Sequence, residues 1–152
     1  MCNDYTQDEF QINTGWQHLL KSASFPKDYP ENMRCIWAFN TDPEGVISVR
    51  VMHMSLDFAG SDAVIFGEGD PPYQNQPTES AIIVRVTWGK KLVSLTSSTH
   101  RLWILFETDD DSRSSSGFYL EIRRVAEYDT GIILQFLVRN AIAILYHNHI
   151  QY

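Results

Sequence analysis

The chain has 152 residues, which suits one domain with a short extension and is long enough to bury a core without many covalent links. Hydrophobic residues make up 43% of it and charged residues 20%, a balance that excludes an intrinsically disordered chain. The net charge of −7 disfavours nucleic acid and an anionic membrane as the main partner, because both require clustered Lys and Arg, and it favours a cationic partner or a bound cation.

Apolar and polar residues alternate with a period of two in five runs, which is typical of half-buried β-strands. In chain order, the residues expected to share one face of each run are Cys35, Trp37 and Phe39; Ile47, Val49 and Val51; Ile82, Val84, Val86 and Trp88; Leu102, Ile104 and Phe106; and Phe118, Leu120 and Ile122. Two loops separate the later runs: residues 67–80 hold three prolines and two glycines, and residues 109–117 are rich in Asp and Ser. Short strands divided by such turns, with no convincing helix before residue 125, predict an all-β sandwich.

The end of the chain differs from the rest. Residues 131–146 form an apolar run that is interrupted by three polar side chains. The run is too short and too polar for a convincing transmembrane helix, so we expect a helix or strand packed on the sandwich. A membrane-proximal segment and a tail foreign to the domain are the alternatives. Trp103 and Tyr119 fall on the outward side of their strands, where they would pack under this tail or form a contact surface for a partner.

The cellular compartment is left open by composition. No positively charged start followed by an apolar run marks a signal peptide after Met1, so the chain is either cytosolic or a piece of a longer secreted protein. It has two cysteines, Cys2 and Cys35, and counting alone cannot decide whether they pair.

A set of ordered segments resembles a known family. Within residues 24–37, the residues that match the family's opening signature are Ser24, Pro26, Tyr29, Pro30, Asn32, Cys35 and Trp37. Residues 61–66, residues 102–109 and the pair Gly117 and Phe118 follow at compatible spacings. Together they resemble the CUB domain family over residues 15–124. The resemblance implies a compact, antiparallel, jelly-roll-like β-sandwich, with a lead-in at residues 1–14 and a C-terminal extension at residues 125–152.

The resemblance also bears on the cysteines. It implies a disulfide between Cys2 and Cys35, which would stabilise the fold by roughly 3–4 kcal/mol in the chain-entropy model. Two free thiols, with Cys35 in the core, are the alternative. The second disulfide that is usual in the family is missing, because its positions fall near Ala59 and at Trp88. We expect Trp88 to fill the vacated space as part of the core.

Many members of the family bind Ca²⁺ at one end of the sandwich, and the resemblance implies a calcium site here. The residues at the matching positions are Asp57, Asp62 and Asp109, with Asp111 and Ser112 as accessory oxygen donors. Calcium takes about six to eight oxygen ligands, which carboxylates, carbonyl groups and water can provide. A solvated acidic loop is the alternative. In calcium-binding members the ion orders loops that present an acidic surface to a basic side chain of a protein partner.

The function that the resemblance implies is an extracellular protein-binding module, one unit of a larger secreted or membrane-anchored protein, and not an enzyme. The sequence contains no nucleophile elbow, Gly-rich phosphate loop or His-Glu-x-x-His motif. The expected partner is another protein, engaged through a basic side chain. Nucleic acid is not expected, and a membrane would be contacted only through the tail. The alternatives are a stand-alone secreted lectin-like adhesion protein, which the acidic composition disfavours, and a non-catalytic accessory domain of a protease.

Overall fold

A computed structural model of the protein describes residues 5–111 and 113–126. Three parts of the sequence-based predictions lie outside these residues, namely Cys2, Ser112 and all but the first two residues of the segment 125–152. In the described part of the chain, no helix has the length and apolar character needed to cross a bilayer.

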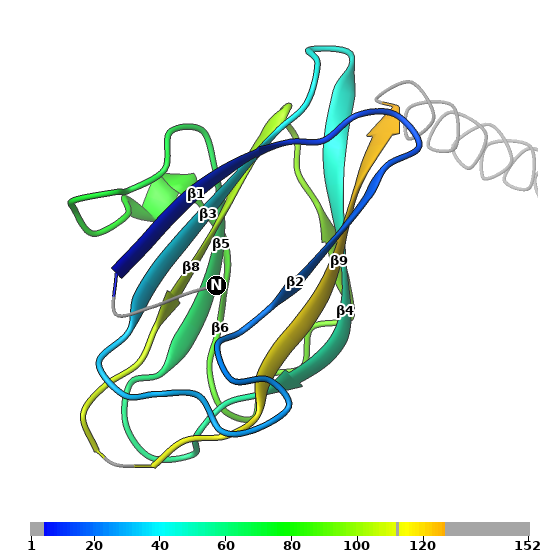
Figure 1. Ribbon diagram of the computed structural model, residues 1–152. Helices are drawn as coiled ribbons and strands as arrows, with labels where there is room; N and C mark the ends of the chain where they lie inside the picture. The colour runs from blue at the N-terminus through cyan, green and yellow to red at the C-terminus, as the bar shows by residue number, and fades with distance from the viewer. Residues whose placement is uncertain (1–4, 112, 127–152) are drawn as a thin grey trace, which may run out of the picture.

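Two β-sheets face each other as the layers of a sandwich (Figure 1). The five-stranded sheet has the order β1 (Tyr5–Gln11), β3 (Arg34–Asn40), β8 (Arg101–Glu107), β5 (Ala63–Glu68) and β6 (Ile82–Val86). The four-stranded sheet has the order β2 (Gln17–Lys21), β9 (Gly117–Ala126), β4 (Gly45–Ser55) and β7 (Ser94–Thr96). A short 3₁₀ turn, η1 (Glu79–Ala81), leads into β6. The predicted all-β sandwich is confirmed, and the paired strands are antiparallel except for β1 and β3.

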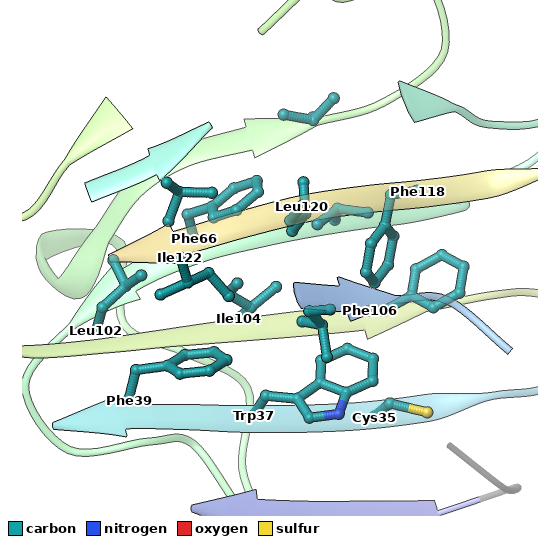
Figure 2. Close-up of a cluster of buried hydrophobic side chains, with 14 of the residues drawn as sticks. Cys35, Trp37, Phe39, Phe66, Leu102, Ile104, Phe106, Phe118, Leu120 and Ile122 are labelled. Carbon is teal, nitrogen blue, oxygen red and sulfur yellow. The ribbon is translucent and has the colours of Figure 1, made fainter. Parts of the chain in front are cut away.

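The core lies between the sheets and is built from the rows predicted to point inward (Figure 2), except that Ile82 packs on the outer face of the five-stranded sheet, where the pairing of β5 with β6 shifts register. β3 supplies Cys35, Trp37 and Phe39, and these pack beside side chains of the neighbouring strand β8 and against side chains of β9 across the interface. Trp37 and Phe106 both contact the ring of Phe118 edge-on, at centroid distances of 5.8 and 5.2 Å. Aromatic rings packed in this way bury large apolar areas, and this burial stabilises the contact between the layers.

The N-terminal segment differs from the expected lead-in. Strand β1 pairs in parallel with β3, from Tyr5 beside Arg34 to Gln11 beside Asn40, so it forms one edge of the five-stranded sheet. Its sequence is polar apart from Phe10, which stacks on Phe39 at 5.3 Å. An edge strand contributes little to the core, so it carries a weak hydrophobic pattern.

Two tryptophans do not lie where the sequence predicted. Trp88 follows the end of β6 and is 63% exposed, so the prediction that it fills the core is wrong. Trp103 points to the outer face of the five-stranded sheet but is fully buried, and is therefore not a contact surface. The loop after β5 covers it with Tyr73, and the indole Nε1 donates a hydrogen bond to the carbonyl of Glu68 at 3.0 Å. Gly67 makes this possible, because any side chain there would overlap the indole ring.

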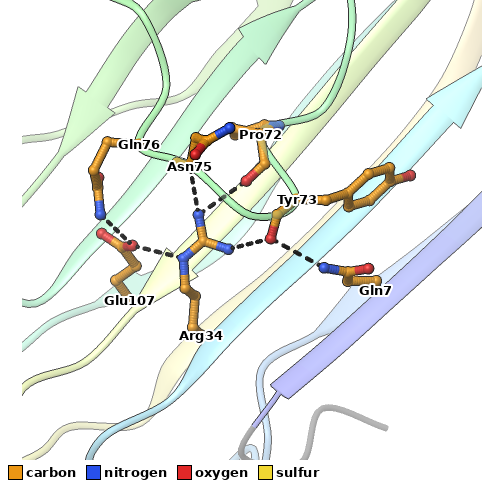
Figure 3. A network of polar contacts seen from close by, with 7 residues as sticks. All are labelled: Gln7, Arg34, Pro72, Tyr73, Asn75, Gln76 and Glu107. Atoms are coloured by element: carbon orange, nitrogen blue, oxygen red, sulfur yellow. Dashed lines mark hydrogen bonds and ion pairs between the residues drawn. The ribbon is translucent and has the colours of Figure 1, made fainter.

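A guanidinium group on the sheet makes several of the hydrogen bonds that fasten the covering loop, alongside a bond from Gln7 to the carbonyl of Tyr73 (Figure 3). Arg34 on β3 donates hydrogen bonds to the carbonyl oxygens of Pro72, Tyr73 and Asn75 at 2.9–3.1 Å, and its Nε pairs with Glu107 at 3.1 Å. A charged donor that satisfies several carbonyl groups of a loop compensates for the lack of regular hydrogen bonding there. The long loop is therefore held in place over the apolar cluster on the outer face of the five-stranded sheet, which consists of Ile36, Ala63, Ile65, Trp103 and Leu105.

Replacing Arg34 with Met should lower the free energy of unfolding by about 2–3 kcal/mol, because carbonyl groups and Glu107 lose charged partners. Urea denaturation measures the loss, and limited proteolysis should show earlier cleavage within residues 69–78. Arg85→Met is the matched control, because Arg85 is 44% exposed and its one ion pair among the described residues, with Glu79, is long at 4.0 Å. The free energy of unfolding of this variant should stay within about 0.5 kcal/mol of the wild type. Equal effects of the two substitutions would contradict this role of Arg34.

The cysteine pairing stays a prediction. Cys35 is fully buried, and the described residues contain no free cysteine. We expect the intact mass of the unreduced chain to be lower than that of the reduced chain by two hydrogen atoms, and reduction to cost roughly 3–4 kcal/mol of stability. Labelling of both thiols by a maleimide in unreduced, unfolded protein would show that the bridge does not form.

Candidate functional site

Three connecting segments meet at one end of the sandwich, and the hydroxyl group of Tyr29 lies between them. Tyr29 is 2% exposed and comes from the segment that precedes β3. Its hydroxyl donates to Oδ2 of Asp62 at 2.6 Å and accepts a hydrogen bond from the backbone N–H of Asp57 at 2.9 Å. One buried phenol thus joins the segment before β3 to both ends of the β4–β5 connection.

The predicted carboxylates are brought together there. Asp62 uses its other oxygen, Oδ1, to accept from the backbone N–H of Asp109 at 2.8 Å, which ties the β8–β9 connection to the same point. Asp109 in turn accepts from the N–H of Ser61 at 2.6 Å and from the N–H of Asp111 at 3.2 Å. Asp57 accepts from the N–H of the residue two positions later at 3.1 Å. We call the four residues Asp57, Asp62, Asp109 and Asp111 the acidic end.

Gly60 lies close to two carboxylates of the acidic end. Its φ of +97° lies in a region that favours glycine, and a Cβ at this position would overlap Oδ2 of Asp109 and come within 2.9 Å of Oδ2 of Asp111. Both carboxylates therefore flank the same stretch of backbone. Ser112, the remaining predicted donor, lies outside the described residues.

The carboxylates of the acidic end differ in their electrostatics. Burial raises the pKa of Asp62, and the nearby negative charges of Asp109 and Asp111 raise it further, against the hydrogen bonds from Tyr29 and the backbone. The pKa of Asp109 is lowered, chiefly by the hydrogen bond from the backbone of Ser61. The buried hydroxyl of Tyr29 has a raised pKa because desolvation and the adjacent carboxylate of Asp62 both oppose its ionisation. A positive charge placed at this end would therefore be favourable.

The chemistry of the acidic end fits a hard cation, since its donors are all oxygen atoms. As the side chains lie, however, no group of three His, Cys, Asp or Glu residues in the described chain is arranged to hold a metal. The hydrogen bonds explain this, because both oxygens of Asp62 and both of Asp109 accept from a hydroxyl or backbone N–H group. The predicted acids lie near one another, and the sequence gave no sign of the hydrogen-bond network that centres on Tyr29.

A His–Ser pair was not anticipated. Nε2 of His53 lies 2.7 Å from Oγ of Ser116, on the exposed side of the four-stranded sheet. Catalysis by such a pair needs a third group that orients the imidazole ring. The ring contacts Phe25 edge-on at 5.4 Å, and no carboxylate among the described residues hydrogen-bonds to it. The pair therefore lacks the arrangement of a catalytic triad.

Comparisons with known proteins agree with this architecture. The sequence model of the CUB domain family matches residues 11–122. The chain is 28% identical over 128 residues to platelet-derived growth factor D of Rattus norvegicus, covering 82% of this chain and 34% of that protein. It is 30% identical over 94 residues to cubilin of Rattus norvegicus, covering 60% of this chain and 2% of that protein. The solved structure of the MASP-1 CUB2 domain bound to Ca²⁺ superposes with a TM-score of 0.59 at 16% identity, covering 74% of this chain and 96% of that chain.

Replacing Tyr29 with Phe should destabilise the protein by about 2–3 kcal/mol, because a buried carboxylate oxygen and a buried N–H group lose their partner. The raised pKa of Tyr29 makes this stabilisation depend on pH. Above about pH 10 the unfolded chain releases the phenol proton while the folded state still holds it. The free energy that the hydroxyl contributes to folding therefore declines as pH rises above about 10. Urea denaturation should therefore show the difference between wild type and Tyr29→Phe narrowing at alkaline pH.

Tyr119→Phe is the control for this experiment, since Tyr119 is half-buried on the outer sheet face and its hydroxyl makes no hydrogen bond among the described residues. It should leave stability nearly unchanged. A difference between wild type and Tyr29→Phe that stays below about 0.5 kcal/mol would show that the hydroxyl does not join the loops.

Proposed function

Because the chain belongs to the CUB domain family, whose members serve as protein-interaction modules in larger extracellular proteins, we propose that it is an extracellular protein-binding module that recognises a basic side chain through its acidic end. The observation that carries the proposal is the convergence of Asp57, Asp62 and Asp109 around the buried hydroxyl of Tyr29. A Lys or Arg side chain is the partner that matches such a group of carboxylates.

We further propose that Ca²⁺ binds at the acidic end, held by Asp57, Asp62 and Asp109 with help from Asp111 and Ser112. The ion would supply the positive charge that offsets repulsion among these carboxylates. Support comes from the all-oxygen chemistry, from the raised pKa of Asp62, and from the shared fold of the Ca²⁺-bound MASP-1 CUB2 domain. The side chains of Asp62 and Asp109 would have to exchange hydrogen bonds for metal contacts, so we expect binding to rearrange this end.

The proposed setting is a larger secreted or membrane-anchored protein. The chain spans about a third of the length of platelet-derived growth factor D and 2% of cubilin, so it corresponds to one module of such relatives. In this proposal the module recognises a partner and does no chemistry of its own.

Calcium binding predicts a rise in thermal stability that depends on the acidic end. At a Ca²⁺ concentration about 100 times the dissociation constant, stability should rise by about 2.7 kcal/mol, because the ion binds the folded chain and not the unfolded one. Melting curves with Ca²⁺ and with a chelator measure the shift, and an equal concentration of Mg²⁺ should give a much smaller one.

Asp62→Asn and Asp109→Asn should each abolish the shift. Asp110→Asn is the matched control: it removes the same charge from the β8–β9 connection that holds Asp109, but Asp110 is exposed and forms no hydrogen bond or ion pair within the described chain. No shift at millimolar Ca²⁺, or an equal shift in all three variants, would rule out the proposed calcium site.

A further inference from the structure

Two exposed aromatic side chains lie together beside the acidic end. Phe58 is 64% exposed and Trp88 is 63% exposed, and their ring centroids are 6.3 Å apart. Phe58 belongs to the β4–β5 connection and Trp88 to the turn after β6, so the fold brings them together from distant parts of the chain. Exposed aromatic pairs are unfavourable in water and often mark contact surfaces.

Trp88 lines a groove of about 240 Å³ between the end of β4 and the turn after β6. Met54 and Leu56 line the β4 side of this groove, and Lys90 and Lys91 lie on its other side. We call this the Trp88 groove. Among its lining residues Leu56 belongs to the core and Met54 packs on it, and two others are cationic.

The two lysines are available to a partner. No ion pair involves Lys90 or Lys91 among the described residues, although the chain carries a net charge of −7 and the acidic end is close by. The backbone N–H of Lys90 donates a hydrogen bond to the carbonyl of Thr87 at 3.1 Å, and this bond closes the turn that presents the lysines. A pair of cations beside apolar side chains is complementary to a segment that carries both carboxylates and apolar side chains.

The edge of strand β4 is also open at this point. β7 pairs with β4 only from Ser48 to Arg50, and the N–H of Val51 is bonded to the carbonyl of Val93. Beyond Val51, β4 pairs with β9 on one side and with no strand of the described chain on the other. The chain before Val93 leaves β4 there, and the groove lies in the resulting gap. An extended peptide can be accommodated along a strand edge of this kind.

We propose that the Trp88 groove binds an extended acidic segment of a partner protein. An apolar side chain of the segment packs against Met54, Leu56 and Trp88, and neighbouring carboxylates pair with Lys90 and Lys91. The site is opposite in charge to the acidic end and is independent of the function proposed for it. The last described residue of the chain, Ala126, pairs with Gly45 at the far end of β4, so the described chain leads away from the groove.

The probe is a fluorescently labelled eight-residue peptide that alternates Glu with Leu and is blocked at both ends, since this pattern places all carboxylates on one side of an extended strand. Fluorescence anisotropy with the full chain should show saturable binding below about 1 mM that weakens as salt is added. A peptide with Lys in place of Glu should not bind the groove.

Trp88→Ala and the double charge reversal Lys90→Glu with Lys91→Glu should each weaken binding by more than about tenfold. Trp16→Ala and Lys27→Glu are the matched controls, because Trp16 is 66% exposed and Lys27 is also exposed, and neither lines the groove. All five positions are exposed, so melting temperatures should stay close to that of the wild type. Binding should also persist in Asp62→Asn and in the presence of a chelator.

Three results would overturn the proposal. One is the absence of binding at millimolar peptide, and another is equal binding by Trp88→Ala and wild type. The third result takes either of two forms. In one, the chain associates with itself as its concentration rises, and Trp88→Ala abolishes this association. In the other, the peptide binds only after residues 127–152 are deleted. Either form of the third result would assign the groove to a second copy or to the chain's own end instead of an acidic partner.

Discussion

The hydroxyl group of Tyr29 holds together the loops that form the acidic end. It donates to Asp62 and accepts from the backbone of Asp57, and Asp62 passes the link on to Asp109. The two contacts of the hydroxyl are short and buried, so the loss of either would leave a buried polar group without a partner, and the bond from Asp62 to Asp109 is partly buried. The loops are thereby fixed relative to the two sheets, and the carboxylates are presented by a frame that the aromatic core supports.

Much of the fold follows from the sequence, because alternation with a period of two reports which face of a strand is buried. The rows that contain Trp37, Ile104 and Phe118 do meet between the sheets. Alternation says nothing about what covers the other face, and Trp103 was therefore expected at the surface although residues of a long loop bury it. Edge strands such as β1 escape prediction for a related reason: little apolar surface is needed where a strand has one neighbour.

The acids of the candidate site were identifiable only through the family resemblance, since clustered Asp residues in a loop have no pattern that separates a metal site from a solvated turn. Their hydrogen-bond partners, and the role of Tyr29 among them, depend on how three loops fold in space. Trp88 shows the same limit. A missing cysteine at its position implied a buried replacement, but the strand ends at Val86 and the ring projects toward Phe58 at the surface.

Gly67 and Trp103 depend on each other, so that neither residue can be replaced without a change in the other. The indole occupies the volume that any side chain on residue 67 would need, and a smaller residue at position 103 would leave a void beneath the loop that Arg34 fastens. Among homologous sequences, the two positions should consequently covary: glycine with tryptophan, and a larger residue at 67 only with a smaller one at 103. An alignment deep enough to measure that coupling would also show in which lineages the loop lost or kept its place over the sheet.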